Sequence, residues 1–463
     1  QRAMEHKAAA QENQITEGII WKQILLFFFP ILFGTFFQQL YNAADAMIVG
    51  RFVGKEALSA VAGSTGMLTQ MVVGFFVGLS SGAAVLVSQY YGAKRGDMVG
   101  YGVHTFLAFS ILAGLAMTVL GIVLSPWMLE AMGTPAEVME MSVLYLRVYF
   151  GGMTGNLVYN SGAAVLRAVG DSKKPLYFLI ISCLINILLD VLFVVFCGLG
   201  VLGAALATIL CQALSAGMVI IALMRTRDMH RLEWSRVRMD GRMLQRMIRI
   251  GFPSGLQSVM YGISNVIIQS AINSLGTDSV AAWAAYSKLD SVFWMIVSAF
   301  GIAATTFVGQ NFGAGRMERV RSGVRTCMMM TILSSVMMSV IIYNWGIYGF
   351  ELFTSDQGVV SIGVAMMRYL SPVYVTYVSI EILSGALRGV GDCWIPMLLC
   401  CGGVCALRVL WVLAAVPLRR DIYTIMFSYP LTWVVTTVLF AVYYVFFSKL
   451  KRERPQGRFE IER

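Results

Sequence analysis

Residues 166–171 read Leu-Arg-Ala-Val-Gly-Asp, and residues 387–392, 221 positions later, read Leu-Arg-Gly-Val-Gly-Asp. A second pair of segments keeps this offset, because residues 87–93 read VSQYYGA and residues 308–314 read VGQNFGA. Two further landmarks recur within two residues of the same offset, namely residues 54–60 with 276–282 and Pro30 with Pro253. Landmarks that keep one order and one spacing predict two copies of one structural unit in the chain.

The composition places both copies in a membrane. Of the 463 residues, 58% are hydrophobic and only 13% are charged, and the mean hydropathy is +0.72. Soluble domains carry about 25% charged residues, so this composition excludes a soluble enzyme and also a disordered chain. The eight cysteines form no CxxC pair, and the three histidines are scattered. We therefore expect reduced, apolar cysteines and neither a metal site nor a cofactor.

Twelve stretches are long and apolar enough to cross a bilayer, which takes about 20 residues of helix. They are residues 24–48, 57–88, 99–124, 138–160, 174–197, 201–224, 248–273, 280–308, 322–343, 360–384, 393–416 and 422–447. With this map, 27 of the 35 Lys and Arg residues fall on the side of the N-terminus, and 4 fall on the opposite side. Basic residues gather on the cytoplasmic side of membrane proteins. We therefore expect both termini in the cytoplasm, and the net charge of +10 needs no nucleic-acid partner.

Six spans per copy give both copies the same orientation in the membrane. This arrangement predicts an all-α integral membrane protein with twelve transmembrane helices in two pseudo-symmetric six-helix bundles, which is a transporter architecture. The expected parts are an N-terminal cytoplasmic segment (1–23), an N-lobe (24–224), a basic linker (225–247), a C-lobe (248–447) and a cytoplasmic tail (448–463). We interpret the Arg-rich linker as a connector that lies in solvent or among lipid headgroups.

Ionisable side chains inside a bilayer are costly, so they usually have a partner or a function. Asp45 lies in the first span, and Tyr41 shares its helix face four residues earlier. Asp190 and Asn186 are spaced in the same way in the fifth span, and Thr208 lies at a similar depth in the sixth. Two carboxylates with amide and hydroxyl oxygens suit a bound proton or a small hard cation such as Na⁺. A structural role for Thr208 alone, bonded to its own helix backbone, is an equally good interpretation.

The second copy lacks this acidic pair, because Ile267 and Trp411 stand at the corresponding positions. Its embedded charges include Glu381, which shares a helix face with Arg388 and is explained equally well by an ion pair or by a function. Lys288, Asp290 and Arg408 are also embedded, and the sequence assigns them no role. The asymmetry suggests that the first copy holds the coupling ion.

Pro30 lies within the first span, fifteen residues before Asp45. Proline removes a helix hydrogen bond and permits a kink. A static kink is one interpretation, and a kink that links ion binding at Asp45 to conformational change is the other.

The whole chain, over roughly residues 20–447, resembles the multidrug and toxic compound extrusion (MATE) transporters, most closely their prokaryotic DinF-like branch. The segments that carry the resemblance are residues 54–61, 89–93, 166–171 with Pro175, 186–190, 200–208, 309–314 and 387–389. The resemblance implies twelve helices in two bundles around a V-shaped cavity. It also implies export of bulky cationic or amphipathic compounds, driven by inward flow of H⁺ or Na⁺.

In DinF-like members a first-lobe site is formed by a proline, a Tyr and an Asp of helix 1, an Asn and an Asp of helix 5, and a Thr of helix 6. The matching residues here are Pro30, Tyr41, Asp45, Asn186, Asp190 and Thr208. We assign the substrate cavity to Gln38, Tyr41, Asn42, Asn160 and Glu381. The NorM-like branch carries a helix-7 Glu about two turns after the proline, but Tyr261 stands there in this chain. This departure favours coupling through the first lobe.

The predicted function is therefore secondary active multidrug efflux by alternating access, in a monomer in the plasma membrane of a prokaryote. Two nearby carboxylates favour H⁺ over Na⁺ because like charges resist joint ionisation. The main alternative is a flippase for lipid-linked precursors, whose cationic cavity would use Arg147, Arg368 and Arg408. No catalytic set of side chains supports a membrane enzyme, and no filter-like segment supports a channel.

Overall fold

The computed structural model describes residues 14–448 and residue 450, and all regular elements within them are helices. The all-α prediction is therefore confirmed for this part of the chain. The expected N-terminal segment and C-terminal tail lie largely outside the described residues. The described chain forms two compact units, of which the first ends at Ile263 and the second begins at Ser264.

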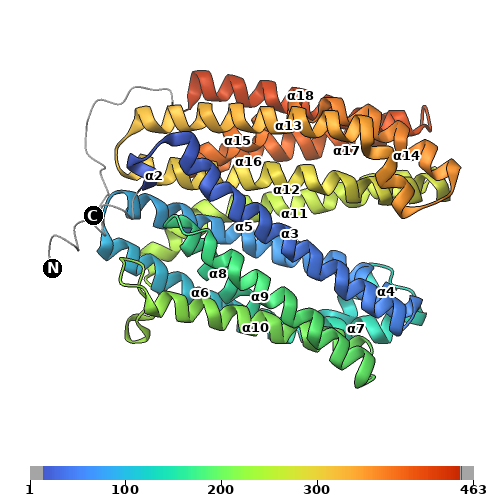
Figure 1. Cartoon of the computed structure of the whole chain (residues 1–463), viewed down its shortest axis with the longest axis horizontal. Coiled ribbons are helices and arrows are strands. Elements are labelled where there is room, and N and C mark those ends of the chain that lie inside the picture. The colour runs from blue at the N-terminus through green and yellow to red at the C-terminus, as the bar shows by residue number, and fades with distance from the viewer. Residues whose placement is uncertain (1–13, 449, 451–463) are drawn as a thin grey trace. The chain divides into compact units, whose positions relative to one another are not determined.

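The first unit contains ten α-helices, a π-helical turn and a 3-10 turn, and its long helices share one general direction (Figure 1). Its elements are α2 (Gln14–Glu17), α3 (Ile20–Phe52), α4 (Lys55–Ala62), α5 (Ser64–Gly92), α6 (Gly96–Ala131), α7 (Ala136–Gly151), α8 (Met153–Ala168), α9 (Lys173–Asp190), η1 (Val191–Phe196), α10 (Val201–Arg225), η2 (Trp234–Arg236) and the first two thirds of α11 (Gly241–Asn273). The division within α11 differs from the predicted lobe boundary, which remains a prediction.

The second unit begins with the end of α11 and contains the remaining helices. They are α12 (Thr277–Gly313), α13 (Met317–Phe353), α14 (Gln357–Leu370), η3 (Ser371–Val373), α15 (Val375–Gly389), α16 (Trp394–Cys400), η4 (Cys401–Ala406), α17 (Leu407–Ala415), α18 (Ile422–Val442) and η5 (Tyr443–Phe447). Both η1 and η4 are π-helical, and such turns often occur near functional sites because they change the register of a helix face.

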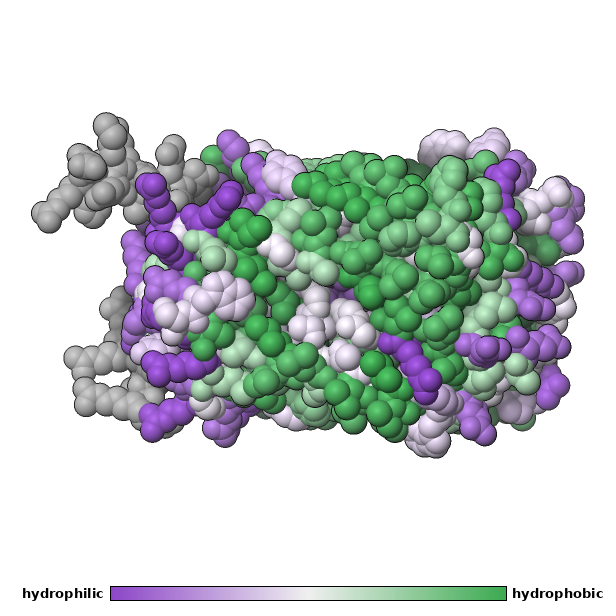
Figure 2. Space-filling view, turned by 90° about the horizontal axis from the view of Figure 1, so that it is seen from below, coloured by the Kyte–Doolittle hydropathy of each residue, from purple (hydrophilic) through white to green (hydrophobic). Residues whose placement is uncertain are grey.

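Each of the twelve predicted spans coincides with a helix or a set of consecutive helices. Among the described residues, nine helices are long and apolar enough to cross a membrane, and α14 and α15 make a tenth span with a 53° bend. The remaining two positions hold α11, whose first turns carry three arginines, and the pair α7 and α8, which breaks at Gly152. One face of the molecule is apolar across its middle and hydrophilic at both ends (Figure 2). These features fit the predicted membrane protein with twelve helices.

The internal repeat is visible in the backbone of each unit. Gly170 and Gly391 end their helices with positive φ angles of 95° and 87°. In both turns the N–H of the next residue, an Asp, donates to the carbonyl five residues back, at 2.8 Å and 2.9 Å. This pattern is a glycine-dependent helix C-cap. The repeated Val-Gly-Asp sequence therefore encodes the same helix end twice, which confirms the predicted duplication at this turn.

The connection between α10 and α11 is docked on the first unit. Tyr91 donates to Asp228 at 2.7 Å, and the Glu233 amide donates to His104 Nε2 at 3.0 Å. Leu232 in the same segment is only 2% exposed. Most residues of the predicted linker (225–247) are exposed, as expected of a connector in solvent or headgroups, and the segment departs from that expectation only at a few buried residues such as His230 and Leu232. Its polar backbone and apolar side chains find partners on α5 and α6, which hydropathy alone does not reveal.

Candidate functional site

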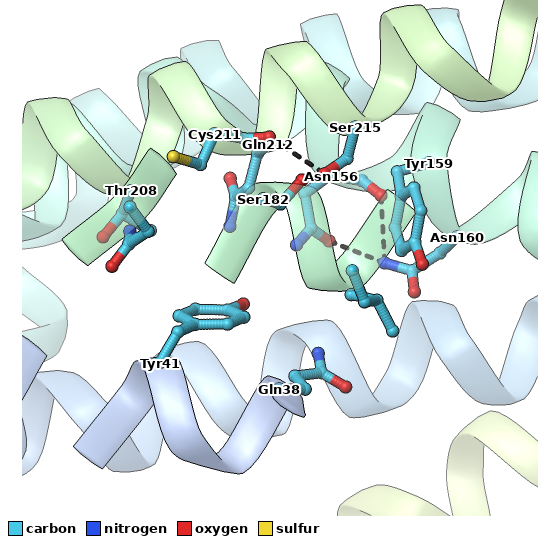
Figure 3. A pocket seen from close by; sticks show the side chains of 12 residues that line it. Gln38, Tyr41, Asn156, Tyr159, Asn160, Ser182, Thr208, Cys211, Gln212 and Ser215 are labelled. Carbon is cyan, nitrogen blue, oxygen red and sulfur yellow. Dashed lines mark hydrogen bonds between the residues drawn. The ribbon is translucent and has the colours of Figure 1, made fainter. Parts of the chain in front are cut away.

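A small polar cavity of about 30 Å³ lies within the first unit. Its walls come from α3, α8, α9 and α10, and Figure 3 shows Gln38 and Tyr41 pointing from α3 toward the side chains of the other helices. The lining residues are Gln38, Tyr41, Asn156, Tyr159, Asn160, Leu179, Ser182, Asn186, Thr208, Cys211, Gln212 and Ser215. A cavity needs about 10–15 Å³ of such space to hold one water molecule. The cavity therefore has room for water or a small cation and none for a bulky drug.

Helical periodicity explains why these side chains meet. Residues three, four or seven apart lie on one face of an α-helix, and each wall is such a face. Gln38 and Tyr41 form the face of α3, while Ser182 and Asn186 form that of α9. The face of α10 runs from Thr208 through Cys211 and Gln212 to Ser215. Each helix thus brings one polar stripe to a common centre in an otherwise apolar bundle.

Two buried carboxyl groups lie beside this cavity. Asp45 on α3 is 6% exposed, and Asp190 at the end of α9 is fully buried. Their carboxyl groups are direct neighbours, and Thr208 Oγ1 donates to Asp45 Oδ2 at 3.3 Å. Neither carboxyl residue lines the cavity itself. Asn186 lines it one turn before Asp190, and Thr208 lines it and is hydrogen-bonded to Asp45. The structure therefore brings together Asp45, Asp190, Asn186, Thr208 and Tyr41, the five residues that we predicted to couple the ion.

Several buried polar atoms of this group lack a hydrogen bond of good geometry among the described residues, although Asp45 and Asp190 face each other, Asn186 is near Cys211 and Gln212 is near Tyr149. These atoms are Asp45 Oδ1, both carboxyl oxygens of Asp190, both amide atoms of Asn186 and Gln212 Oε1. Buried polar atoms are normally paired, and each unpaired atom costs about 1–3 kcal/mol. Oxygen atoms of carboxylate, amide and hydroxyl groups are the ligands that small hard cations prefer. The donor set thus fits a proton shared by the two carboxyl groups or a cation such as Na⁺.

On the other side of the carboxyl groups the same helices become apolar. A buried apolar side chain lies four residues along the chain from each of Asp45, Asp190 and Thr208. These are Val49, Val194 and Ala204, which pack in one cluster together with Tyr145. The carboxyl groups therefore lie at a boundary, with polar side chains on one side and a dry apolar cluster on the other.

The other predicted residues lie in different surroundings. Gln38 and Asn160 line the cavity, where Asn160 donates to Asn156 Oδ1 at 3.0 Å. Asn42 is exposed and lies outside the lining. Pro30 is buried within α3, which continues as one helix on both sides of it. The substrate-cavity assignments remain predictions.

Glu381 belongs to the second unit, where α15 packs against α12. Tyr377 donates to Glu381 Oε2 at 3.1 Å. A Cβ atom at Gly301 of α12 would lie 2.5 Å from Glu381 Oε1, so the glycine makes room for this carboxyl group. Among the described residues Glu381 and Arg388 make no contact within 4.0 Å, but the Arg388 charge lies near enough to act on this carboxyl group, so both interpretations of Glu381 stay open.

Our sequence analysis missed Asn156, Ser182, Gln212 and Ser215, although all four line the cavity. Ser182 and Ser215 are hydrogen-bonded to each other across α9 and α10. A signal for them was present, because each lies four or seven residues from a predicted residue on the same helix. Extending each polar stripe by one or two turns would have found them.

Two of the charges that we expected to be embedded in the second unit, Asp290 and Arg408, have protein partners, whereas Lys288 is exposed. Trp294 Nε1 donates to Asp290 at 2.6 Å, and Tyr286 and Tyr374 also donate to this carboxylate. The Arg408 guanidinium is 4% exposed, lies 4.1 Å from the ring centroid of Tyr429 and donates to Thr432 at 2.9 Å. A buried cation over an aromatic face is stabilised by the ring quadrupole. These contacts explain Asp290 and Arg408 as parts of an aromatic core.

Replacing Tyr429 by Leu is expected to lower the free energy of unfolding by about 2 kcal/mol, because Arg408 loses its aromatic face. Replacing Tyr429 by Phe keeps the ring and is the matched control, with an expected change below about 0.5 kcal/mol. Thermal unfolding of the purified protein in detergent measures both. Equal stability of the two variants would show that the stacking contributes nothing.

Comparisons with known proteins agree with this architecture. The MatE family model matches residues 30–192 and again residues 253–412, so each copy of the repeat matches once. The "Probable multidrug resistance protein YoeA" of Bacillus subtilis is 28% identical over 94% of this chain and 95% of its own length. The "Probable multidrug resistance protein YpnP" of the same organism is 30% identical over 81% of this chain and 84% of its own length.

A solved structure of a MOP superfamily transporter from Pyrococcus furiosus superimposes with a TM-score of 0.88. It covers 95% of this chain and 98% of its own, at 21% sequence identity, which shows a shared fold. The family match covers most of the chain in two halves, and the fold agrees with it throughout. The protein is therefore a multi-pass membrane transporter that belongs to the MatE family, and it is not an enzyme.

Proposed function

We propose that this protein is a secondary active exporter of bulky cationic or amphipathic compounds, driven by entry of H⁺ or Na⁺ at Asp45 and Asp190. The observation that carries the proposal is the pair of buried carboxyl groups that face each other beside a polar cavity. The names of the Bacillus relatives, and that of the "Multidrug export protein MepA" of Staphylococcus aureus, support multidrug compounds as the cargo.

The coupling step follows from electrostatics. Two ionised carboxylates in contact and away from water repel each other, and a bound cation relieves this repulsion. An ion that binds one conformation more tightly than the other shifts the balance between them, and its gradient can then drive export. A shared proton needs no further ligand, whereas Na⁺ would also draw on Asn186 and Thr208. We propose H⁺ as the coupling ion and retain Na⁺ as the alternative.

The flippase alternative has weaker support. Arg147 is exposed and donates to the Ile122 carbonyl at 3.2 Å, and Arg368 is exposed over the ring of Tyr343. Arg408 is buried against Tyr429. Each arginine that would hold a pyrophosphate thus has its own local partner.

Transport into liposomes separates the coupling ions. Purified protein is reconstituted, and ethidium movement is followed by fluorescence under a pH gradient, under a Na⁺ gradient and without a gradient. We expect transport only under the pH gradient. Transport under the Na⁺ gradient alone would replace H⁺ by Na⁺. Absence of transport under both gradients, with a folded protein, would contradict the export of cationic drugs and favour lipid cargo.

We also propose in which membrane the protein lies, how its termini are oriented and which molecules it contacts. The distribution of Lys and Arg supports cytoplasmic termini, and the bacterial relatives support the plasma membrane of a prokaryote. The partners are then the lipid bilayer and small amphipathic molecules. We propose that the transporter acts as a monomer, with no cofactor other than the coupling ion.

A further inference from the structure

A second and larger cavity lies at the other end of the first unit's helices. Its volume is about 350 Å³, and it is lined by the start of α3, the end of α5, the turn between α8 and α9, and the connection after α10. We call it the linker cavity. It shares no lining residue with the small polar cavity, so it is independent of the proposed coupling site.

Both carboxylates in the wall of the linker cavity are held by protein groups. Asp171 accepts the Lys174 amide at 3.2 Å and lies 3.5 Å from the Lys174 ammonium. Asp228 accepts Tyr91 and the Met229 amide, each at 2.7 Å. Neither carboxylate therefore depends on a bound cation.

Asp228 also stays ionised at neutral pH. Burial would raise the pKa of this carboxyl group, but bonds from His230, Tyr91 and the Met229 amide hold the pKa below its ordinary value. His230 Nδ1 lies 3.5 Å from its Oδ2 atom. The negative charge at this wall is thus balanced from within the protein.

Two further groups in the wall of the cavity, Ser172 and Lys173, can donate hydrogen bonds to a ligand. Ser172 is 5% exposed and lines the cavity, yet its hydroxyl makes no hydrogen bond among the described residues, not even as a cap of α9. His230 is also 5% exposed and lines the cavity, but its Nδ1 faces Asp228 Oδ2 at 3.5 Å. Lys173 adds a cation without a carboxylate within 4.0 Å in this part of the chain. These groups surround the N-terminus of α9, a helix of 18 residues.

We propose that the linker cavity binds a phosphate group, and that an anionic phospholipid headgroup of the adjacent leaflet supplies it. The dipole at a helix N-terminus attracts anions, although at α9 Asp171 already accepts the Lys174 amide and Pro175 has no N–H, and a lysine beside this helix end adds a charge-assisted bond. Leu26, 49% exposed, and Phe27 give the cavity an apolar side where an acyl chain can continue. Basic pockets between transmembrane helices on the cytoplasmic side are places where acidic lipid headgroups bind.

Comparison of the two copies of the repeat shows that Ser172 and Lys173 of the linker cavity occur in the first unit alone. The duplicated turn continues as Ser172 and Lys173 in the first unit, but as Cys393 and Trp394 in the second. The Asp after the glycine is shared, and in the second unit Tyr443 donates to it. The turn therefore forms in both units. The Ser172 hydroxyl and the Lys173 ammonium at the start of the next helix have no counterparts in the second unit.

The test uses the full-length protein in detergent with short-chain phosphatidylglycerol, short-chain phosphatidylcholine or inorganic phosphate. Binding is followed by native mass spectrometry and by the rise in unfolding temperature. The variants are K173Q and S172A, and the control K22Q removes an exposed charge beside the cavity without altering its lining. We expect tight binding of phosphatidylglycerol, a loss of at least about tenfold in K173Q, a smaller loss in S172A and a change within about twofold in K22Q.

Equal binding by K173Q and the unmodified protein, or an equal loss in K22Q, would overturn the site. S172A is expected to fold normally because Ser172 makes no capping bond, so its loss of binding cannot come from misfolding. Binding of inorganic phosphate without preference for phosphatidylglycerol would overturn the lipid as the source of the phosphate. Failure of ethidium export would leave this result unaffected, because lipid binding is measured without transport.

Discussion

Replacing Asp45 by Asn is expected to abolish gradient-driven export while the protein folds normally. Asparagine keeps the size of the side chain and can still accept the bond from Thr208, but it removes the charge that the coupling ion neutralises. Coupling free energies of 1–3 kcal/mol correspond to factors of about 5 to 150, so the loss should be on the order of 100-fold. Asp190→Asn should have the same effect, because the two carboxyl groups act as a pair. Initial rates of ethidium transport in liposomes measure both.

The matched control is Asp97→Asn, the same chemical change at an exposed residue in the first turn of α6. It should transport at the normal rate. Thr208→Val is expected to lose less than either Asp variant, because it removes a hydroxyl shared between Asp45 and the Ala204 carbonyl and leaves both charges. Normal gradient-driven export by both Asp45→Asn and Asp190→Asn would contradict the coupling site.

The second large effect is expected for Gly385→Leu. Gly385 and Gly389 form a Gly-xxx-Gly face of α15 that packs against the backbone of α12. A Cβ atom at Gly385 would lie 2.8 Å from the Gly301 carbonyl oxygen, and one at Gly389 would lie 2.9 Å from the Thr305 carbonyl oxygen. A leucine side chain must therefore push two helices apart, at a cost of about 3 kcal/mol or more. The unfolding temperature should fall by roughly 6–12 °C.

Gly402→Leu provides the control for this prediction. Gly402 lies in the same unit, and a Cβ atom there would meet no neighbouring atom within 4 Å. The same substitution should leave the unfolding temperature nearly unchanged. An equal fall in both variants would show that the close approach of α15 and α12 does not limit stability.

Much of the fold could be predicted because the length of an apolar stretch and the position of its charges indicate where a helix crosses the membrane. Stretches of about 20 apolar residues must form helices, since the bilayer offers no other partners for the backbone. The repeated Val-Gly-Asp turn was recognisable because glycine takes the positive φ angle that ends both helices. The carboxyl residues Asp45 and Asp190 could be found because a charge inside an apolar stretch is expensive.

The docked connection after α10 could not be predicted in the same way. Its contacts with α5 and α6 join residues that lie more than 100 positions apart, such as Tyr91 with Asp228. An Arg-rich segment with a few apolar residues has the same sequence pattern whether it lies among lipid headgroups or packs against the end of a helix. Asp290 shows the same limit, because its donor Tyr374 comes from the turn before α15, 84 residues away in the chain.

The sequence by itself predicted the helical spans, the duplication and the five residues of the proposed coupling site, because periodicity, apolar length and buried charge are properties of local stretches. Only the tertiary structure decided which polar stripes meet around one cavity, that Asp45 and Asp190 are neighbours, and that Ser172, Lys173 and His230 share a second cavity. The physical reason is that helix packing selects among many faces of similar polarity. The selection depends on close approaches, such as those at Gly301 and Gly385, that are set by several helices together.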